Sequence, residues 1–283
     1  MSLRFSSRLA VLGGLLLAGV SPLRAVGANG NKDAKEIVQM AMQAELAADK
    51  NDHTQWRYRD AKKEGTDTVG IVVETHHGTV RRVIMRNGQP LSGAEAKAED
   101  DRVQRFIHDQ DKLAKQKRDG VQDGKNAEDL LRMLPEAFTW KLVSEDEQKY
   151  TLHFDPNPNF SPPDIKGRVL GTMAGTLVVS KPENRIETIS GKLTQDVTIG
   201  WGLLGRLHEG GTFRVERREV APRLWEIVET HVHIEGKALF FKTIGEQQDE
   251  VQTEFTLVPP GTTLEQAVEL SKPTNGAQNA THR

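Results

Sequence analysis

The sequence predicts a mainly β protein of the α+β class. We expect a strongly curved antiparallel sheet or incomplete β-barrel of about 11–12 strands, with an N-terminal helix and mid-chain helices covering the concave side. Three observations predict this class. Apolar and polar residues alternate in many short segments after residue 55, short turns separate neighbouring segments, and a charged stretch with helical periodicity interrupts them between residues 92 and 135.

Residues 1–28 have the pattern of a secretory signal peptide. Arg4 and Arg8 precede an uninterrupted apolar run from residue 9 to 20, and small residues follow up to Ala28. The run is too short to cross a hydrocarbon layer of about 30 Å, although an uncleaved anchor is the alternative. Cleavage near residue 28 would place the protein in the periplasm or secrete it.

The composition argues against a nucleic-acid partner and excludes disulfide bonds and lipidated cysteines. The chain without residues 1–28 keeps 35 basic and 40 acidic residues, a net charge of −5, so no nucleic-acid partner is expected. It contains no cysteine, hence no disulfide and no lipidated cysteine, which fits a bacterial envelope protein. No second apolar stretch has membrane-spanning length, so no transmembrane span is expected after processing.

The chain after the leader begins with a helix and a hairpin. Residues 33–50 are expected to be helical because their apolar residues recur at intervals of three and four. Candidate strands follow at residues 55–60, 68–75 and 79–86. The tight segment at Gly78 makes the last two a hairpin, and Asn87-Gly88 closes the unit with a turn.

A helical insertion at residues 92–135 interrupts the strands. We expect one charged amphipathic helix over residues 94–118, ended by Gly120, and a short helix over residues 127–134 that stops at Pro135. The polar face of the first helix mixes acids and bases nearly evenly, which favours a lid or packing helix over a membrane-surface helix.

The rest of the chain, to residue 258, is predicted to be almost entirely strand. The candidate strands are 139–144, 148–154, 172–180, 185–190, 192–199, 212–220, 224–235, 238–244 and 250–258. Short turns at 181–184 and 235–237 indicate antiparallel neighbours. We expect a single half-barrel domain over residues 29–260, followed by a short helix and a disordered tail over residues 261–283.

One strand carries a candidate metal site. His231 and His233 lie two positions apart, so both imidazoles point to the same face. A metal site would need a third ligand from a neighbouring strand. The alternative, which we favour, is the solvated face of an amphipathic strand, and no cofactor is expected.

The glycine-rich segment at residues 199–207 carries Trp201, Leu203 and Leu204 between two strands. These side chains either tuck back under the sheet or form an apolar loop that touches an acyl chain, a lipid surface or a partner. The segment also spells G-x-G-x-x-G, but strands on both sides exclude the βαβ setting that dinucleotide binding needs. The chain has no cysteine and no G-x-S-x-G elbow, and we do not expect an enzyme.

The leader, the N-terminal amphipathic helix, the long antiparallel meander and the mid-chain helices together resemble the bacterial lipoprotein-carrier superfamily (LolA/LolB-like) over residues 33–258. The segments PNPNFSPP and GWG are also similar to those of exported bacterial proteins without a defined activity. The first resemblance implies a half-open barrel with a helical lid and an apolar cavity for acyl chains.

The expected partner is therefore an apolar small molecule, a lipid or an acyl chain, with an envelope protein as a further partner. Besides Trp201, Leu203 and Leu204, strand residues would line the cavity: Leu193, Val197, Ile199, Phe213, Val215, Phe240 and Ile244. Two other functions stay open: a non-catalytic envelope scaffold with a filled interior, and a metal-dependent hydrolase with a third ligand near both histidines.

Overall fold

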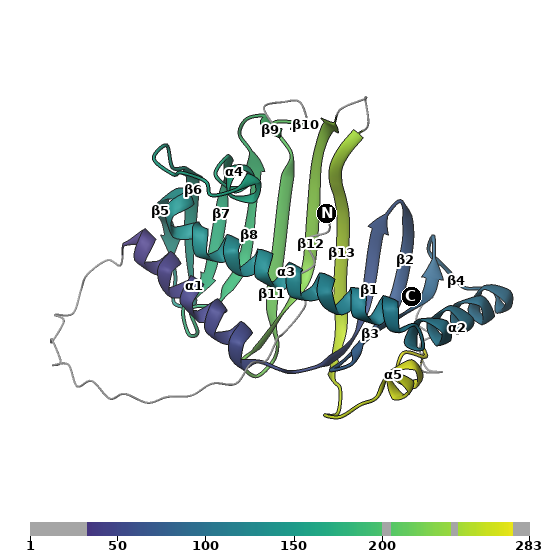
Figure 1. Ribbon diagram of the computed structural model, residues 1–283. Coiled ribbons are helices and arrows are strands. Elements are labelled where there is room, and N and C mark those ends of the chain that lie inside the picture. The colour runs from purple at the N-terminus through teal and green to yellow at the C-terminus, as the bar shows by residue number, and fades with distance from the viewer. Residues whose placement is uncertain (1–32, 200–204, 239–242, 274–283) are drawn as a thin grey trace.

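The computed structural model describes residues 33–199, 205–238 and 243–273. The described strands form one open, curved antiparallel sheet of 13 strands, which confirms the predicted fold class (Figure 1). The order along the sheet is β4-β3-β2-β1-β13-β12-β11-β8-β7-β6-β5. The short strand β10 pairs with β12, and β9 pairs with β10. The two ends of the sheet, β4 and β5, are not paired with each other, so the barrel stays incomplete.

The elements have the following bounds. The strands are β1 (Trp56–Glu64), β2 (Thr66–Thr75), β3 (Gly78–Arg86), β4 (Gln89–Pro90), β5 (Phe138–Glu145), β6 (Lys149–Pro156), β7 (Met173–Ser180), β8 (Ile186–Leu193), β9 (Val197–Ile199), β10 (Gly205–Leu207), β11 (Thr212–Ala221), β12 (Leu224–Ala238) and β13 (Thr243–Leu257). The helices are α1 (Ala34–Asn51), α2 (Gly93–Ile107), α3 (Gln110–Ala137), α4 (Ile165–Leu170) and α5 (Leu264–Leu270).

Two predictions about the mid-chain helices are wrong. The expected helix over residues 94–118 is broken after Ile107, because Asp109 caps a new helix by accepting a hydrogen bond from the backbone N–H of Lys112. That new helix, α3, runs through Gly120 and past Pro135 to Ala137. A glycine inside a helix costs only about 1 kcal/mol relative to alanine, so it need not end one.

The predicted turn at residues 235–237 is also wrong. β12 continues through Gly236 to Ala238, and β10 pairs with this extension. The close approach of the two backbones requires the missing side chain, since a Cβ at Gly236 would lie 3.1 Å from the Cα of Leu207. Glycine here indicates close strand contact rather than a turn.

The hydrophobic residues of the sheet form two separate clusters. Core 1 lies at the β5–β8 end of the sheet, under α1 and the C-terminal half of α3. Its fully buried members include Ile37, Val38, Ala41, Ala137, Leu152, Phe154, Leu177, Val179 and Leu193. Core 2 lies at the β2–β3 end and is formed with α2 and α5; its members are Ile71, Val73, Val80, Val103, Ile107, Val258, Ala267 and Val268.

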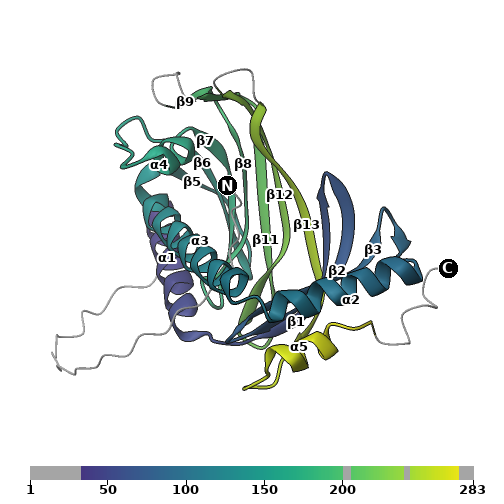
Figure 2. The ribbon, with the colours of Figure 1, turned by 45° about the vertical axis from the view of Figure 1, so that its right-hand side comes forward.

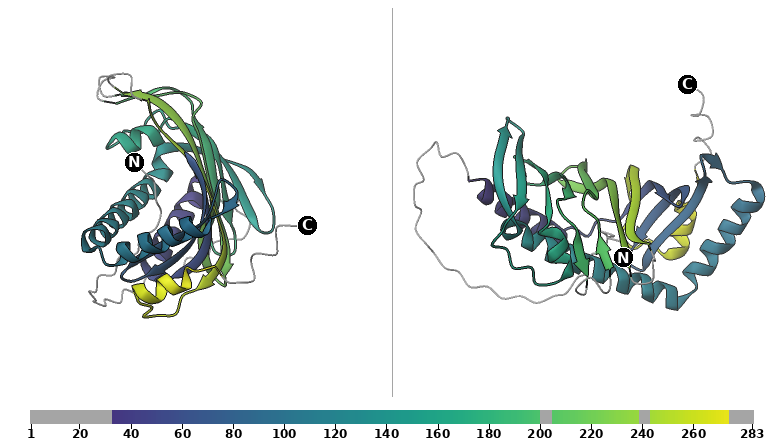
Figure 3. Two further views of the ribbon diagram at one scale, coloured as in Figure 1. Left: turned by 90° about the vertical axis from the view of Figure 1, so that its right-hand side faces the viewer. Right: turned by 90° about the horizontal axis from the view of Figure 1, so that it is seen from above.

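The two cores lie on opposite faces of the sheet. Ladder partners point to the same face. One row of partners begins in core 1 and crosses the sheet: Leu177, Ile189, Val215, Thr230, Glu250 and Lys62. Ile71 of core 2 pairs with Arg59, an odd number of positions from Lys62, and therefore points to the other face. Core 1 is on the concave face, around which the sheet curves in the left-hand view of Figure 3.

The helix α3 crosses the concave face as a bridge. It packs against both ends of the sheet, on β3 and on β5 (Figures 1 and 2). At the β3 end, the amide of Gln116 accepts from the backbone N–H of Thr79 (2.8 Å) and donates to its carbonyl (3.0 Å). At the β5 end, Leu134 and Ala137 enter core 1. The break at Asp109 lets the chain pass from core 2 on one face to the concave face.

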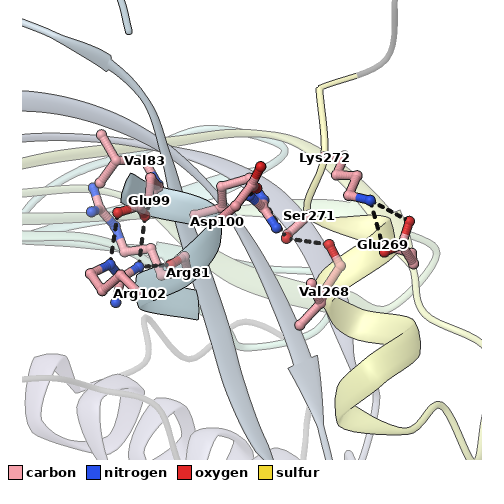
Figure 4. A network of polar contacts seen from close by, with 10 residues as sticks. Arg81, Val83, Glu99, Asp100, Arg102, Val268, Glu269, Ser271 and Lys272 are labelled. Atoms are coloured by element: carbon pink, nitrogen blue, oxygen red, sulfur yellow. Dashed lines mark hydrogen bonds and ion pairs between the residues drawn. The ribbon is translucent and has the colours of Figure 1, made fainter. Parts of the chain in front are cut away.

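A polar network ties α2 and α5 to β3 (Figure 4). Glu99 accepts from the backbone N–H of Val83 (2.7 Å), and the buried Arg82 donates to Ser271 Oγ (3.0 Å) and pairs with Asp100. Glu99, Arg82 and Asp100 all have charged or hydrogen-bonding partners, so this network helps to hold α2 and α5 against β3.

Candidate binding face

The concave side of the central strands has an apolar zone and a polar cluster. The ladders place them next to each other, because Phe213 pairs with Val232 and Val232 with Gln248. The apolar zone consists of Phe213, Val215, Val232 and Ile234 on β11 and β12. The concave polar cluster consists of Asp60, Lys62, Arg81, Gln248, Glu250 and Gln252 on β1, β3 and β13.

Four charged side chains are linked in the concave polar cluster. Lys62 Nζ lies 3.0 Å from Glu250 Oε2 and 3.6 Å from Asp60 Oδ2. Arg81 Nε donates to the same oxygen of Asp60 (2.7 Å), and its Nη2 donates to Thr68 Oγ1 (3.1 Å). Two carboxylates and two cations are thus held together, and their formal charges cancel.

Two glutamines complete the cluster from β13. Gln248 Nε2 donates to Glu250 Oε2 and Gln252 Nε2 to Glu250 Oε1, both at 2.8 Å. Glu250 is therefore surrounded by donors on both oxygens. Within the described part of the chain, Asp60 Oδ1, Gln248 Oε1 and the indole Nε1 of Trp56 are buried without a hydrogen-bond partner. Trp56 lies on the same face of β1 as Asp60, four positions away.

The two carboxyl groups respond differently to burial. Burial raises the pKa of Asp60, and the nearby Glu250 adds to this, while Lys62 and Arg81 oppose it. Burial also acts to raise the pKa of Glu250, but Lys62 and the two glutamine amides outweigh it, so the pKa of Glu250 is lowered. Glu250 is the stable anion of the pair, and Asp60 is the less completely stabilised one.

The buried positions in the middle of α3 are small. Gly120 and Ala127 are both buried, whereas the large buried side chains of this helix cluster toward its end at Leu134. Between Gly120 and Ala127, α3 therefore buries only small residues. A few polar groups beside apolar residues on a concave surface are features of many ligand sites.

The structure places the predicted ligand-binding residues in three different settings. Leu193 and Val197 are fully buried in core 1, so packing accounts for them. Phe213 packs against the edge of core 1 and belongs to the apolar zone, as does Val215. The remaining candidates lie outside the described residues: Trp201, Leu203, Leu204 and Phe240, with the side chains of Ile199 and Ile244.

The sequence prediction missed the concave polar cluster. Its signal is a period-two repeat of polar residues, Asp60 and Lys62 on one strand and Gln248, Glu250 and Gln252 on another. The opposite faces of these strands also carry charged residues, among them Arg59 and Asp249, so alternation alone did not reveal a buried side.

The candidate metal ligands lie on the face of the sheet opposite the polar cluster. Asp249 of β13 pairs with His231 in the ladder and accepts from its Nδ1 at 2.6 Å, and His233 Nε2 lies 3.0 Å from both oxygens of Asp249. A third polar group is thus within reach of both histidines. Among the described residues, however, no group of three or more His, Asp, Glu or Cys could hold a metal ion.

A shallow groove of about 350 Å³ lies near the β11–β12 turn, and its lining includes Arg214, Glu216 and Arg218. Glu216 pairs with both arginines at 2.7 and 2.6 Å. Arg214 and Arg218 share this one carboxylate, and pairs with such exposed arginines contribute little to stability.

Comparison with known proteins identifies no relative: no family model, no curated protein and no solved structure matches the chain. Among the described residues, no helix is long and apolar enough to span a membrane.

Proposed function

We propose that this chain is an exported protein of the bacterial envelope that binds one acyl-chain ligand on its concave face, beneath α3. The observation that carries this proposal is the bridge: α3 packs on β3 and β5, while the apolar zone lies on the concave face of the strands between them. The pattern of residues 1–28 supports export, and the open curved sheet with a helical cover is the layout that the resemblance to lipoprotein carriers implies.

The energetics favour an acyl chain as the apolar part of the ligand. Each CH₂ group moved from water to an apolar surface contributes about 0.8 kcal/mol, so a chain of about ten carbons offers about 8 kcal/mol before the costs of association. Phe213, Val215 and Ile234 are only partly buried, so contact with a chain would remove further apolar surface from water.

The first test is native mass spectrometry of the mature protein purified from the periplasm without detergent, followed by denaturing extraction. We expect a co-purifying fatty acid, phospholipid or lipopeptide, and an N-terminus near residue 28. An unliganded mass, together with no uptake of an added fluorescent fatty acid, would contradict the proposal and leave the scaffold function.

A matched pair of variants locates the site. Val215→Trp fills the apolar zone, and we expect it to weaken fatty-acid binding at least tenfold. Val251 lies in the same sheet but points to the opposite face and is exposed, so Val251→Trp should leave binding unchanged. Equal effects of the two substitutions would place the ligand elsewhere. Circular dichroism and urea midpoints of both variants control for folding.

A further inference from the structure

The groove near the β11–β12 turn lies in a notch of the sheet. β11 pairs with β8 only as far as the partners Glu216 and Thr188, whereas β11 itself continues to Ala221. The groove has a volume of about 350 Å³ and is lined by side chains of β6 and β8 on one side and of β11 and β12 on the other. It is therefore an open surface site between two parts of the sheet.

The arginines of the groove lie on the face opposite the concave polar cluster. Arg214 pairs in the ladder with His231, and His231 pairs with Asp249. Ladder partners point to the same face, so Arg214 shares the face of Asp249. Glu216 and Arg218 follow at intervals of two on β11 and contact each other, which places them on that face as well.

Positive charge exceeds negative charge among the side chains that line the groove. Four of them are cations and three are carboxylates. Lys149 and Glu187 pair with each other at 2.5 Å. Glu216, by contrast, serves both Arg214 and Arg218, at 2.7 and 2.6 Å. One carboxylate therefore has to balance two guanidinium groups.

The other two charged side chains of the lining do not remove this excess. Arg217 pairs with Glu45, which is in turn shared with Arg185. Glu219 accepts from the backbone N–H of Arg223 at 2.6 Å, so its carboxylate holds the β11–β12 turn. Each shared carboxylate thus balances only one of its two arginines.

Arg214 and Arg218 have unused hydrogen-bond donors that solvent can reach. Arg214 donates to Glu216 through Nη2, and Arg218 donates through Nε and Nη2. In the described part of the chain, Nε and Nη1 of Arg214 and Nη1 of Arg218 donate to no protein acceptor. Glu229 is 3.7 Å from Arg218 Nη2, beyond hydrogen-bond distance. The two arginine side chains are 47% and 62% exposed, so a ligand has access to them.

This arrangement selects an oxyanion as the ligand. Both oxygens of Glu216 already accept hydrogen bonds, and no group of acidic or histidine side chains among the described residues could hold a metal ion. Two guanidinium groups that contact the two oxygens of one carboxylate are close enough to contact one tetrahedral anion. A phosphate group has acceptor oxygens in several directions and can accept from both arginines, whereas a carboxylate is filled by one bidentate arginine.

We propose that Arg214 and Arg218 bind a phosphate group in this groove, with Glu216 holding their guanidinium groups side by side. The inference goes beyond the proposed function, because the site lies on the other face of the sheet and needs no acyl chain. The phosphate can belong to a soluble phosphate ester or to the head group of a membrane lipid, and the test distinguishes these two sources.

The first measurement is titration calorimetry with inorganic phosphate at low ionic strength, because salt screens exposed charges. We expect saturable binding with a Kd on the order of 1 mM, and at least tenfold weaker binding by Arg218→Gln and by Arg214→Gln. Arg223→Gln is the control, since this side chain is 87% exposed and does not line the groove; it should bind like the parent protein. Circular dichroism and urea midpoints control for folding.

Three results would overturn the inference. The first is the absence of saturable phosphate binding by the parent protein. The second is equal binding by Arg218→Gln and Arg223→Gln, which would mean a general effect of charge. The third is acetate binding as tight as phosphate binding, because the proposal requires an anion that accepts from two arginines.

Co-sedimentation with phosphatidylglycerol vesicles identifies the source of the phosphate. If the parent protein sediments with the vesicles and Arg218→Gln does not, the phosphate belongs to a lipid head group. If the parent protein stays in the supernatant although inorganic phosphate binds, the phosphate belongs to a soluble ester. Both results support the phosphate site, and sedimentation that does not depend on Arg218 counts against it.

Discussion

Both ends of the sheet bury hydrophobic residues beneath helices, but they do so on opposite faces. At the β5–β8 end, core 1 fills the concave face beneath α1 and α3, and its central residue Leu177 is fully buried. At the β2–β3 end, core 2 occupies the other face beneath α2 and α5, with Val73 and Val80 at its centre. A continuous sheet thus exchanges the face on which its hydrophobic cluster lies between the two ends.

This exchange explains where polar residues can gather. Because core 2 stabilises β2 and β3 from the other face, the concave face of β1, β3 and β13 does not have to supply the hydrophobic core at this end of the sheet. Asp60, Lys62 and Glu250 occupy that face, although a buried charged cluster is seldom the most stable filling for a protein interior. Stability is therefore a poor explanation of their presence on that face.

The largest expected effect concerns the attachment of α1 to the sheet. Glu45 of α1 is 5% exposed; it accepts from Arg185 (3.1 and 3.0 Å) and also pairs with Arg217 of β11. Glu45→Ala leaves two guanidinium groups without their shared anion, so we expect a loss of about 3–5 kcal/mol in the free energy of unfolding, measured with urea. Glu36→Ala, on the exposed side of the same helix, is the control and should change it by less than about 0.5 kcal/mol.

The next prediction tests whether the two cores are independent. Leu177→Ala in core 1 should cost about 2–5 kcal/mol, and Val80→Ala in core 2 about 1–3 kcal/mol. Because the residues share no cluster and lie on opposite faces, the double variant should show the sum within about 0.5 kcal/mol. A coupling above about 1 kcal/mol in the urea experiments would mean that the two ends form one core.

Sequence patterns were sufficient for the sheet because its signals are local. The period-two alternation and the turns predicted most strands, and the stripe of Ile37, Val38 and Ala41 predicted α1. The break between α2 and α3 was missed because Asp109 lies in a continuous run of helix-forming residues. Only the packing of α2 and α3 on different faces makes a cap necessary there.

The candidate site was harder to predict from the sequence than the fold. Leu193 and Val197 are apolar residues that could either line a cavity or fill a core. Only the folded structure assigns them to core 1. Asp60 and Gln248 are 188 positions apart in the chain and meet through β1 and β13, a pairing between distant segments that no local pattern encodes. The sequence therefore predicts which residues of a strand share a face. It does not predict on which face each end of the sheet forms its hydrophobic core.

A smaller expected effect separates function from stability at the polar cluster. Replacing both members of the central pair, Lys62→Met with Glu250→Gln, removes one charge of each sign, and we expect the free energy of unfolding to change by no more than about 1 kcal/mol or to rise. Binding of a fluorescent fatty acid should nevertheless fall, because Gln248, the ladder partner of Val232 in the apolar zone, loses the carboxylate that orients its amide. Lys62→Met alone should be less stable than the double variant, since it leaves Glu250 without its cation. A destabilised double variant that still binds normally would reverse this comparison.

The smallest effect is expected on the far side of the same central strands, where Asp249 accepts hydrogen bonds from His231 and His233. These bonds lower the pKa of Asp249 below its ordinary value of 3.8. A carboxylate with a lowered pKa in the folded state adds stability above the pKa of the unfolded state, and that contribution is lost as the pH falls through the lowered value.

The three side chains are partly exposed, so Asp249→Asn should cost less than about 1 kcal/mol at pH 7. The difference in free energy of unfolding between the variant and the parent protein should become smaller as the pH is lowered to 3. Urea unfolding at each pH measures this difference. A large loss in the free energy of unfolding that does not change with pH would contradict this prediction. It would mean that Asp249 and the two histidines are needed to hold β12 against β13.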